Sequence, residues 1–221
     1  MPQIDISHRS ALLKGEMTLE NLFHTTVSDG HLTAARWLDN DREQALTFAQ
    51  YKEISYDYAD YLQKAIGRER KGRFVAIQME TSYHWFPTFW GLVAAGYQVV
   101  LLDASLSDDM TDFMLGQAGA VALVVKNKRS LSHDALQILH EDLFAAKGHE
   151  GFMPQFASQV ALCTSGTTAT SRIFVYDEEA VCHQVLNSEL LHRLNPRIVS
   201  GNPERSLSFL PYHHVFGFMV N

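Results

Sequence analysis

The sequence predicts an α/β fold in which mostly parallel β-sheets are flanked by helices. Residues 74–79, 99–102 and 121–125 are almost continuously apolar, as in strands that are buried on both faces of a sheet. Segments with helical periodicity separate them, and strands that alternate with helices are typical of a parallel sheet covered on both sides. With 46% apolar and 19% charged residues, the chain has enough material for a core and disorder is not expected.

The first helix is expected over residues 18–28, with Thr18 as its N-cap and Asp29-Gly30 as its end. A strand at residues 46–48 leads into a second helix, which ends at Gly67. Apolar side chains recur there every three or four positions and indicate one buried face: Tyr51, Ile54, Tyr58, Leu62 and Ala65.

Residues 81–102 contain no Asp, Glu, Lys or Arg, and the stretch is long enough to span a bilayer. Pro87 and Gly91 interrupt it, however, so a helix followed by a strand explains the stretch better than a membrane span. We expect a helix that is capped by Ser82, is kinked or starts late because of Pro87, and ends near Gly96 before the next strand. No membrane span is therefore predicted.

Ser107 and an acidic first turn predict the cap of a further helix, which Gly119 ends. Residues 126–156 are mixed in character and are expected to form a linker with a short helix around residues 135–140. The helical residues expected to point inward are Met110, Phe113 and Met114.

Downstream, strands are expected at residues 160–163, 173–176 and 206–210. Asp177 is the expected cap of a helix that ends at Asn195-Pro196. Its apolar face would consist of Val181, Val185, Leu190 and Leu194.

Composition excludes several classes of function. The net charge of −7, without a long block of one sign, argues against nucleic acid or an anionic membrane as the main partner. Cys163 and Cys182 lack CxxC spacing, and with no signal-peptide pattern they indicate a cytoplasmic protein. The 11 histidines include no HExxH, and no metal site is predicted.

The common nucleotide and hydrolase fingerprints are also missing. No two of the 13 glycines are separated by one residue, which excludes GxGxxG. Residues 67–72 have the glycine spacing of a Walker loop but lack its Lys-Ser/Thr pair, so they are interpreted as a turn. Ser165 does not lie in a GxSxG elbow, so it is not expected to be a hydrolase nucleophile.

The densest group of potential phosphate donors is Thr164-Ser165-Gly166-Thr167-Thr168, which Arg172 follows. Hydroxyls and backbone N–H groups in such a loop can converge on one anion. Composition alone leaves a polar hairpin turn as the alternative. The run resembles the phosphate-binding signature of the adenylate-forming superfamily, which comprises acyl-CoA synthetases, adenylation domains of nonribosomal peptide synthetases, and luciferases. There it reads Thr-Ser-Gly-Thr-Thr-Gly-x-Pro-Lys-Gly and closes over the β- and γ-phosphates of ATP.

Four positions depart from that signature, because Ala169, Ser171, Arg172 and Ile173 replace Gly, Pro, Lys and Gly. Ala169 loses the freedom to adopt a positive φ. Arg172 keeps the positive charge but presents it as a planar fork.

A second segment, Leu210-Pro211-Tyr212-His213-His214-Val215-Phe216-Gly217, is similar to the family's Leu-Pro-x-x-His-x-x-Gly. The resemblance implies that His214 and Gly217 border the pocket for the acyl substrate and the adenylate. The alternative for His214 is a histidine held in a turn by Pro211. Looser agreement upstream extends the resemblance over residues 46–221.

The resemblance implies that residues 1–221 form a partial, N-terminal AMP-binding domain, the incomplete first half of the family's large domain. Residues 46–125 would be a subdomain of alternating strands and helices, and residues 157–221 would carry the phosphate loop. The implied cofactors are ATP and Mg²⁺. The implied partners are a carboxylic acid and the thiol of CoA or of a phosphopantetheinyl carrier protein.

Family enzymes are much longer than this chain, and their adenine, ribose and magnesium sites belong to later sequence. The chain is therefore expected to act with the C-terminal remainder of the same enzyme and not to complete adenylation alone. The alternative is a non-catalytic binding or scaffolding module, suggested by Ala169, Ser171 and Ile173.

Overall fold

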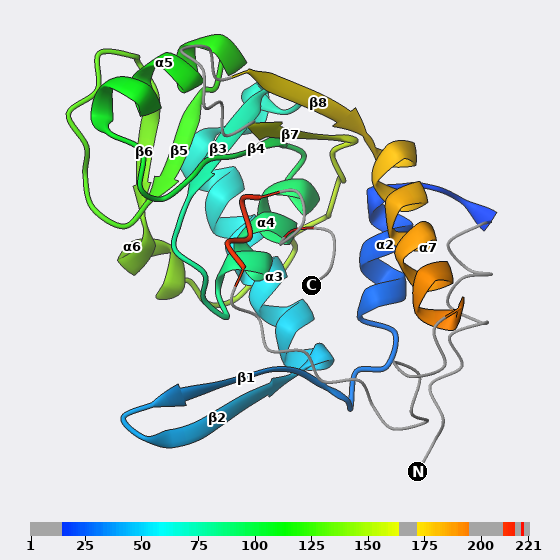
Figure 1. The fold of residues 1–221 in the computed structure, drawn as a ribbon. Coiled ribbons are helices and arrows are strands. Elements are labelled where there is room, and N and C mark those ends of the chain that lie inside the picture. Colours follow the sequence, from blue (N-terminus) through cyan, green and yellow to red (C-terminus); the bar gives the residue numbers. More distant parts are fainter. Residues whose placement is uncertain (1–14, 164–171, 195–209, 215–217, 219–221) are drawn as a thin grey trace.

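The structure is a computed structural model of the 221-residue chain, and it describes residues 15–163, 172–194, 210–214 and 218. The described part contains a six-stranded sheet with the strand order β6-β5-β3-β4-β7-β8 (Figure 1). Five of these strands run parallel, and β8 pairs with β7 in the antiparallel direction. The strands are β3 (Phe74–Gln78), β4 (Gln98–Leu101), β5 (Ala122–Val125), β6 (Leu136–Leu139), β7 (Gln159–Cys163) and β8 (Ile173–Asp177).

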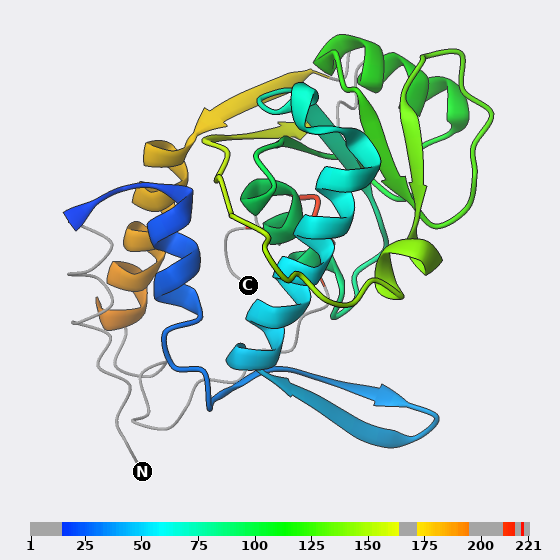
Figure 2. The same ribbon diagram turned by 180° about the vertical axis from the view of Figure 1, so that it is seen from behind.

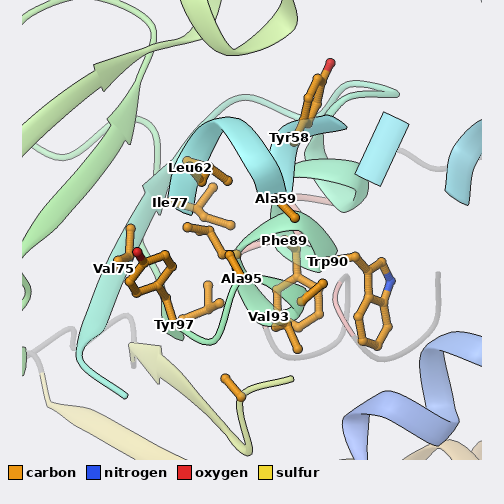
Figure 3. Packing of buried hydrophobic residues seen from close by; sticks show 14 of the residues in the cluster. Tyr58, Ala59, Leu62, Val75, Ile77, Phe89, Trp90, Val93, Ala95 and Tyr97 are labelled. Atoms are coloured by element: carbon orange, nitrogen blue, oxygen red, sulfur yellow. The ribbon is translucent and has the colours of Figure 1, made fainter. Parts of the chain in front are cut away.

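Both faces of the sheet are covered, as the continuous apolar strands predicted. Successive side chains of a strand point to opposite faces, so Val75 and Ile77 of β3 join one core cluster and Ala76 joins the other. The larger cluster lies under α3 (Phe48–Ile66) and α4 (Trp85–Ala94), as Figure 3 shows. On the other face, α5 (Asp108–Ala118) contributes Met114 and Leu115. The mostly parallel α/β fold is confirmed.

The predicted caps account for several helix ends. The hydroxyls of Thr18 and Ser107 accept hydrogen bonds from backbone N–H groups in the first turns of α2 (Leu19–Thr26) and α5. Asp177 does the same for α7 (Glu178–Leu194). Gly67 and Gly119 follow α3 and α5 with φ of 101° and 60°, which a glycine adopts without strain. These boundaries are local properties, which is why the sequence predicted them.

Helix α4 starts late, at Trp85, and the side chain of Ser82 does not cap it, which corrects that prediction. Its N-cap position is His84, and Pro87 lies in the first turn, where the missing N–H has no partner to lose. The helix is buried on nearly all sides. Within the described part of the chain, no helix has the length and apolarity that a membrane crossing needs.

Other predictions were also wrong, and one is that Ala65 lies on the buried face of α3, since its side chain is exposed. Residues 135–140 do not form a helix, because residues 136–139 form β6, which extends the parallel sheet beside β5. The short helix α6 (His140–Phe144) begins only after that strand. In α5, Met110 and Phe113 are 37% and 50% exposed, whereas Thr111 and Met114 are buried. The helix is rotated relative to the predicted face, because it meets the sheet through positions 111, 114 and 115.

Residues 33–47 form a β-hairpin, and for residues 33–45 the sequence pattern predicted no structure. Strands β1 (Thr33–Asp39) and β2 (Arg42–Thr47) are antiparallel, and both views show the hairpin projecting from the body (Figures 1 and 2). Asn40 and Asp41 make the turn with φ of 47° and 62°. Two positive φ values suit a tight hairpin turn, and Asn and Asp tolerate them better than most residues.

Helices α2 and α7 lie side by side although they are far apart in the sequence (Figures 1 and 2). The carboxylate of Glu178 accepts a hydrogen bond of 3.0 Å from the backbone N–H of Leu19, at the start of α2. Val181 and Cys182 of α7 are buried. The side chains of Leu190 and Leu194, the end of the helix at Asn195-Pro196 and the strand predicted at residues 206–210 lie outside the described residues, apart from Leu210.

Candidate functional site

The residues that flank the hydroxyl-rich run belong to two paired strands. Cys163, the last residue of β7, is the cross-strand partner of Ile173, the first residue of β8. Because β7 pairs in parallel with β4, Cys163 lies at the carboxyl edge of the sheet, beside the residues that follow β4. Ligand sites of open α/β sheets lie at this edge. Arg172 is described, is exposed and directly precedes β8.

The predicted phosphate-binding residues Thr164, Ser165, Gly166, Thr167 and Thr168 lie outside the described residues, as does Gly217. Their roles therefore remain predictions. What the structure places is the frame around them: the strand end at Cys163, the cation at Arg172 and the start of β8.

The segment around His214 comes to the same edge of the sheet. Tyr212 packs against Trp85 and Phe86 of α4, with ring centroids 5.4 and 4.7 Å apart. Nε2 of His213 lies 3.4 Å from Oδ2 of Asp103, the second residue after β4. His214 itself is exposed, and its backbone N–H donates to the carbonyl of Pro211. The structure thus turns His213, which the sequence analysis did not select, toward the carboxyl edge.

The environment of Asp103 favours the ionised carboxylate. Partial burial raises its pKa, but Oδ1 accepts hydrogen bonds of 2.8 Å from the N–H and 2.7 Å from the hydroxyl of Ser105. Together with nearby His213 these bonds hold the pKa of Asp103 below its ordinary value. Burial lowers the pKa of His213, Asp103 opposes that effect, and the pKa stays below its usual range. At neutral pH the pair is therefore a carboxylate facing a largely neutral imidazole.

Cys163 is not a nucleophile at this site. Burial raises the pKa of its thiol to about 12, so almost no thiolate exists at neutral pH. The side chain instead packs against the smaller core cluster. We assign it a structural role at the base of the loop.

A cavity of about 310 Å³ lies at the same edge, beyond the ends of β3 and β5. Gln78, at the end of β3, donates from Nε2 to the carbonyl of Asp103 and to the hydroxyl of Thr111, both at 3.0 Å. Three cations from the turn after β5 also line the cavity, and two of them are paired, Arg129 with Asp108 at 2.6 Å and Lys126 with Glu80 at 3.7 Å. The cations are Lys126, Lys128 and Arg129. This cavity was not predicted from the sequence, although three cations directly after a buried strand were a visible signal of it.

A group of aromatic rings adjoins this edge where the chain leaves β3. The ring of His84 stacks on Phe144 with centroids 3.8 Å apart, and its Nδ1 lies 2.6 Å from the hydroxyl of Tyr58. Burial lowers the pKa of His84 to about 4, and nearby His140 adds to the effect. Burial and Lys126 lower the pKa of His140 to about 4 as well. Both imidazoles are therefore neutral at pH 7. In the residues that the structure describes, no three His, Cys, Asp or Glu side chains gather as a metal site.

Comparison with known proteins identifies the family of this chain. The model of a family described as AMP-binding enzyme matches residues 24–221. A curated relative, a long-chain-fatty-acid–CoA ligase from Yersinia pestis, is 28% identical over 116 residues, which are 48% of this chain and 20% of that protein.

Solved structures share the fold. O-succinylbenzoate coenzyme A synthetase (MenE) from Bacillus subtilis, solved in complex with AMP, has a TM-score of 0.71 at 20% identity, over 89% of this chain and 51% of that chain. The N-terminal subdomain of NpsA from Klebsiella oxytoca, in complex with anthranilyl-AMSN, has a TM-score of 0.69 at 19% identity. The match covers 89% of this chain and 49% of that chain. The chain thus spans about half the length of these two solved chains and a fifth of the curated relative.

Proposed function

Because this chain belongs to the family of AMP-binding enzymes, we propose that it is the N-terminal part of a ligase that activates a carboxylic acid with ATP. The observation that carries the proposal is the position of the two strand ends between which the hydroxyl-rich run lies in the sequence. Its flanking residues Cys163 and Ile173 are paired at the carboxyl edge of the sheet, and Asp103 and His213 meet at this same edge. A run of hydroxyls, a glycine and a following cation, anchored there, suits a triphosphate.

In the first step, an oxygen of the substrate carboxylate attacks the α-phosphorus of ATP. The bond to the β-phosphate oxygen breaks, and the products are an acyl-adenylate and pyrophosphate. Thr164, Ser165, Thr167 and Thr168 would donate hydrogen bonds to the leaving pyrophosphate, whose charge grows in the transition state. Arg172 would add a positive charge at the end of the loop. ATP would enter as its magnesium complex, and the ion would offset phosphate charge.

In the second step, a thiol attacks the acyl carbonyl and AMP leaves. The thiol would belong to CoA or to a phosphopantetheinyl carrier protein. His214 and Gly217 would border the acyl and adenylate pocket, and the contact of His213 with Asp103 would hold that segment against β4. The free thiols of Cys163 and Cys182 suit the reducing cytoplasm, where we place the enzyme.

The loop is tested by titrating the chain with MgATP and following the heat of binding. Arg172→Ala removes the cation and is expected to weaken binding about tenfold, as for a lost charge-assisted hydrogen bond. Arg172→Lys, which restores the residue of the family signature, is expected to retain most of the affinity. Arg42→Ala, on the projecting hairpin, is the matched control. If Arg172→Ala and Arg42→Ala bind MgATP with equal affinity, Arg172 does not contact the nucleotide.

The reaction is tested by pyrophosphate exchange into ATP with a panel of carboxylic acids, using the longest polypeptide that the gene encodes. Exchange that depends on one class of acid is expected. If no acid supports exchange although MgATP binds, the ligase is replaced by the second candidate, a non-catalytic binding or scaffolding module. The substitutions Ala169, Ser171 and Ile173 in the signature favour that candidate. The reading frame beyond Asn221 separates the two, because only the ligase needs an adenine-site motif and a lysine-bearing C-terminal domain there.

A further inference from the structure

A second cavity, of about 370 Å³, opens at the amino edge of the sheet, opposite the edge that carries the hydroxyl-rich loop. Its walls come from three separate parts of the chain: the end of α3 at Gln63, the turn before β3 at Arg68 and Lys71, and the segment before β7 at Gln155. Nothing in the adenylation chemistry uses these residues.

Gln63, which lines this cavity, has a buried donor without a partner in the described part of the chain. The side chain is only 4% exposed, and its Oε1 accepts a hydrogen bond of 2.7 Å from Nε of Arg68. A guanidinium can only donate, so this bond sets which end of the amide is oxygen and which is nitrogen. Nε2 is then buried with no partner among the described residues. A buried donor without an acceptor is costly, and native structures rarely leave one.

The charged residues that line the cavity, Arg68 and Lys71, are both cations. Nζ of Lys71 donates to Oε1 of Gln155 at 2.8 Å, so each cation is bonded to a neutral amide. Within the described residues, neither has a carboxylate within ion-pair distance. Their charges therefore remain uncompensated beside the orphan N–H groups of Gln63.

The stem of Lys71 packs closely against the turn at Gly96. Gly96 has a φ of +92°, and a Cβ there would lie 3.2 Å from Cδ of Lys71 and 3.1 Å from the carbonyl oxygen of Gln155. The absence of a side chain lets the stem of Lys71 lie across the turn. The N–H of Gln155 donates to the carbonyl of Ala94 at 2.8 Å, which ties the same segment to the end of α4. Lys71 and its partner Gln155 are thus preorganised, which lowers the cost of binding a ligand.

We propose that this cavity binds an oxyanion, the phosphate or carboxylate group of a small metabolite. Nε2 of Gln63, the guanidinium of Arg68 and the ammonium of Lys71 supply one neutral and two charged donors to it. Charge-assisted hydrogen bonds of this kind are the strong ones. The site lies away from the adenylation site and does not depend on the proposed ligase activity.

The side-chain amide of Gln63 gives a pair of signals in ¹⁵N–¹H spectra that reports binding directly. This pair is assigned as the one that disappears in Gln63→Met. The chain is titrated at constant ionic strength with inorganic phosphate in one arm and with succinate in the other. We expect saturable shifts of this amide in one arm or both, and the arm that binds more tightly identifies the class. Arg68→Gln and Lys71→Gln are expected to weaken binding by at least about tenfold.

Arg70→Gln is the matched control, because Arg70 carries the same charge on the same 3₁₀ turn (Arg68–Arg70) but does not line the cavity. It is expected to leave the affinity unchanged. Circular dichroism establishes that each variant is folded. Absence of a saturable shift in both arms overturns the proposal. An equal loss of affinity in Arg70→Gln and in Arg68→Gln also overturns it, because the anion would then be attracted by the general positive charge and not bound in the cavity. Arg68→Gln and Lys71→Gln are expected to keep MgATP binding, so failure here is distinct from failure of the ligase proposal.

Discussion

At the scale of single residues, two partly buried histidines, His84 and His140, have strongly shifted pKa values. The pKa of each is lowered to about 4, first by burial. For His84 the neutral form also suits the contact with Tyr58, because burial raises the pKa of that phenol, and a protonated hydroxyl and a neutral imidazole can share one hydrogen bond at this distance. The two imidazoles are therefore uncharged in the fold and take up protons only on strong acidification or on unfolding.

This linkage predicts how stability depends on pH. The folded pKa lies below the unfolded value of 6.5, so the unfolded state binds protons first as the pH falls. The free energy of unfolding is expected to be undiminished above pH 7 and to decrease between pH 6.5 and about 4. Both rings are partly solvated, so we expect about 1 kcal/mol per histidine.

Urea unfolding at pH 7.5 and at pH 5 measures the effect. His84→Gln keeps a polar group near Tyr58 but cannot titrate, and its loss of stability between the two pH values should be smaller than in the wild type. His183→Gln, at an exposed position of α7, should behave as the wild type does. The same loss in His84→Gln as in the wild type would assign the pH dependence to other groups.

At the scale of elements, α3 and α4 approach each other closely at Gly91 (Figure 3 shows the core that they cover). A Cβ added there would lie 3.0 Å from Cβ of Tyr58, 3.2 Å from the carbonyl oxygen of Ser55 and 3.3 Å from the backbone nitrogen of Ala59. Two of these atoms belong to the backbone of α3, which cannot move aside as a side chain can. The glycine lets the two helices pack at this distance.

Gly91→Ala is therefore expected to destabilise the protein by about 1–3 kcal/mol, the usual range for overpacking, although alanine favours a helix. Gly116→Ala in α5 is the matched change, because the nearest atom to its added Cβ is 4.0 Å away. It is expected to stabilise by about 0.5–1 kcal/mol through helix propensity. Chemical unfolding measures both, and a stabilising Gly91→Ala would show that α3 and α4 can separate without cost.

The helix α5 also shows where pattern reasoning fails. Its cap at Ser107 and its end at Gly119 were predicted correctly, because hydrogen bonding in one turn and a positive φ are local requirements. Its buried face was not, since Met110 and Phe113 are apolar but exposed. Which apolar residues face inward is set by how the helix is rotated on the sheet, and this depends on contacts with distant segments.

At the scale of the whole molecule, β8 is an edge strand with apolar side chains. It pairs with β7 on one side, and in the described part of the chain no strand pairs with its other side. Phe174 and Val175 are 45% and 49% exposed. An exposed, apolar edge strand is a template for pairing with another chain.

The isolated chain is accordingly expected to associate with itself as its concentration rises. Val175→Lys places a charge in the middle of β8 and is expected to reduce this association. Leu38→Lys is the control, because Leu38 is 74% exposed but lies on the projecting hairpin. Sedimentation velocity over a range of concentrations compares the three proteins. Association that Leu38→Lys reduces and Val175→Lys does not would place the contact on the hairpin.

The candidate site was predictable in part. The residue types of the loop and the resemblance of residues 164–172 and 210–217 can be identified without coordinates, because they depend on a linear pattern. The contact between Asp103 and His213 is not visible in the sequence, since neither residue lies in the same segment as the other. The same holds for the cavity lined by Gln63, Lys71 and Gln155, which three distant segments build.

By itself, the sequence determined the order of most helices and strands and where several of them end, since caps, glycines and apolar runs act over one or two turns. The tertiary structure alone decided that residues 136–139 form a strand, that β8 is antiparallel, and that His213 rather than His214 faces Asp103. It also decided the strand order of the sheet. The physical reason is that these properties depend on pairing and packing between segments distant along the chain, for which no local pattern exists.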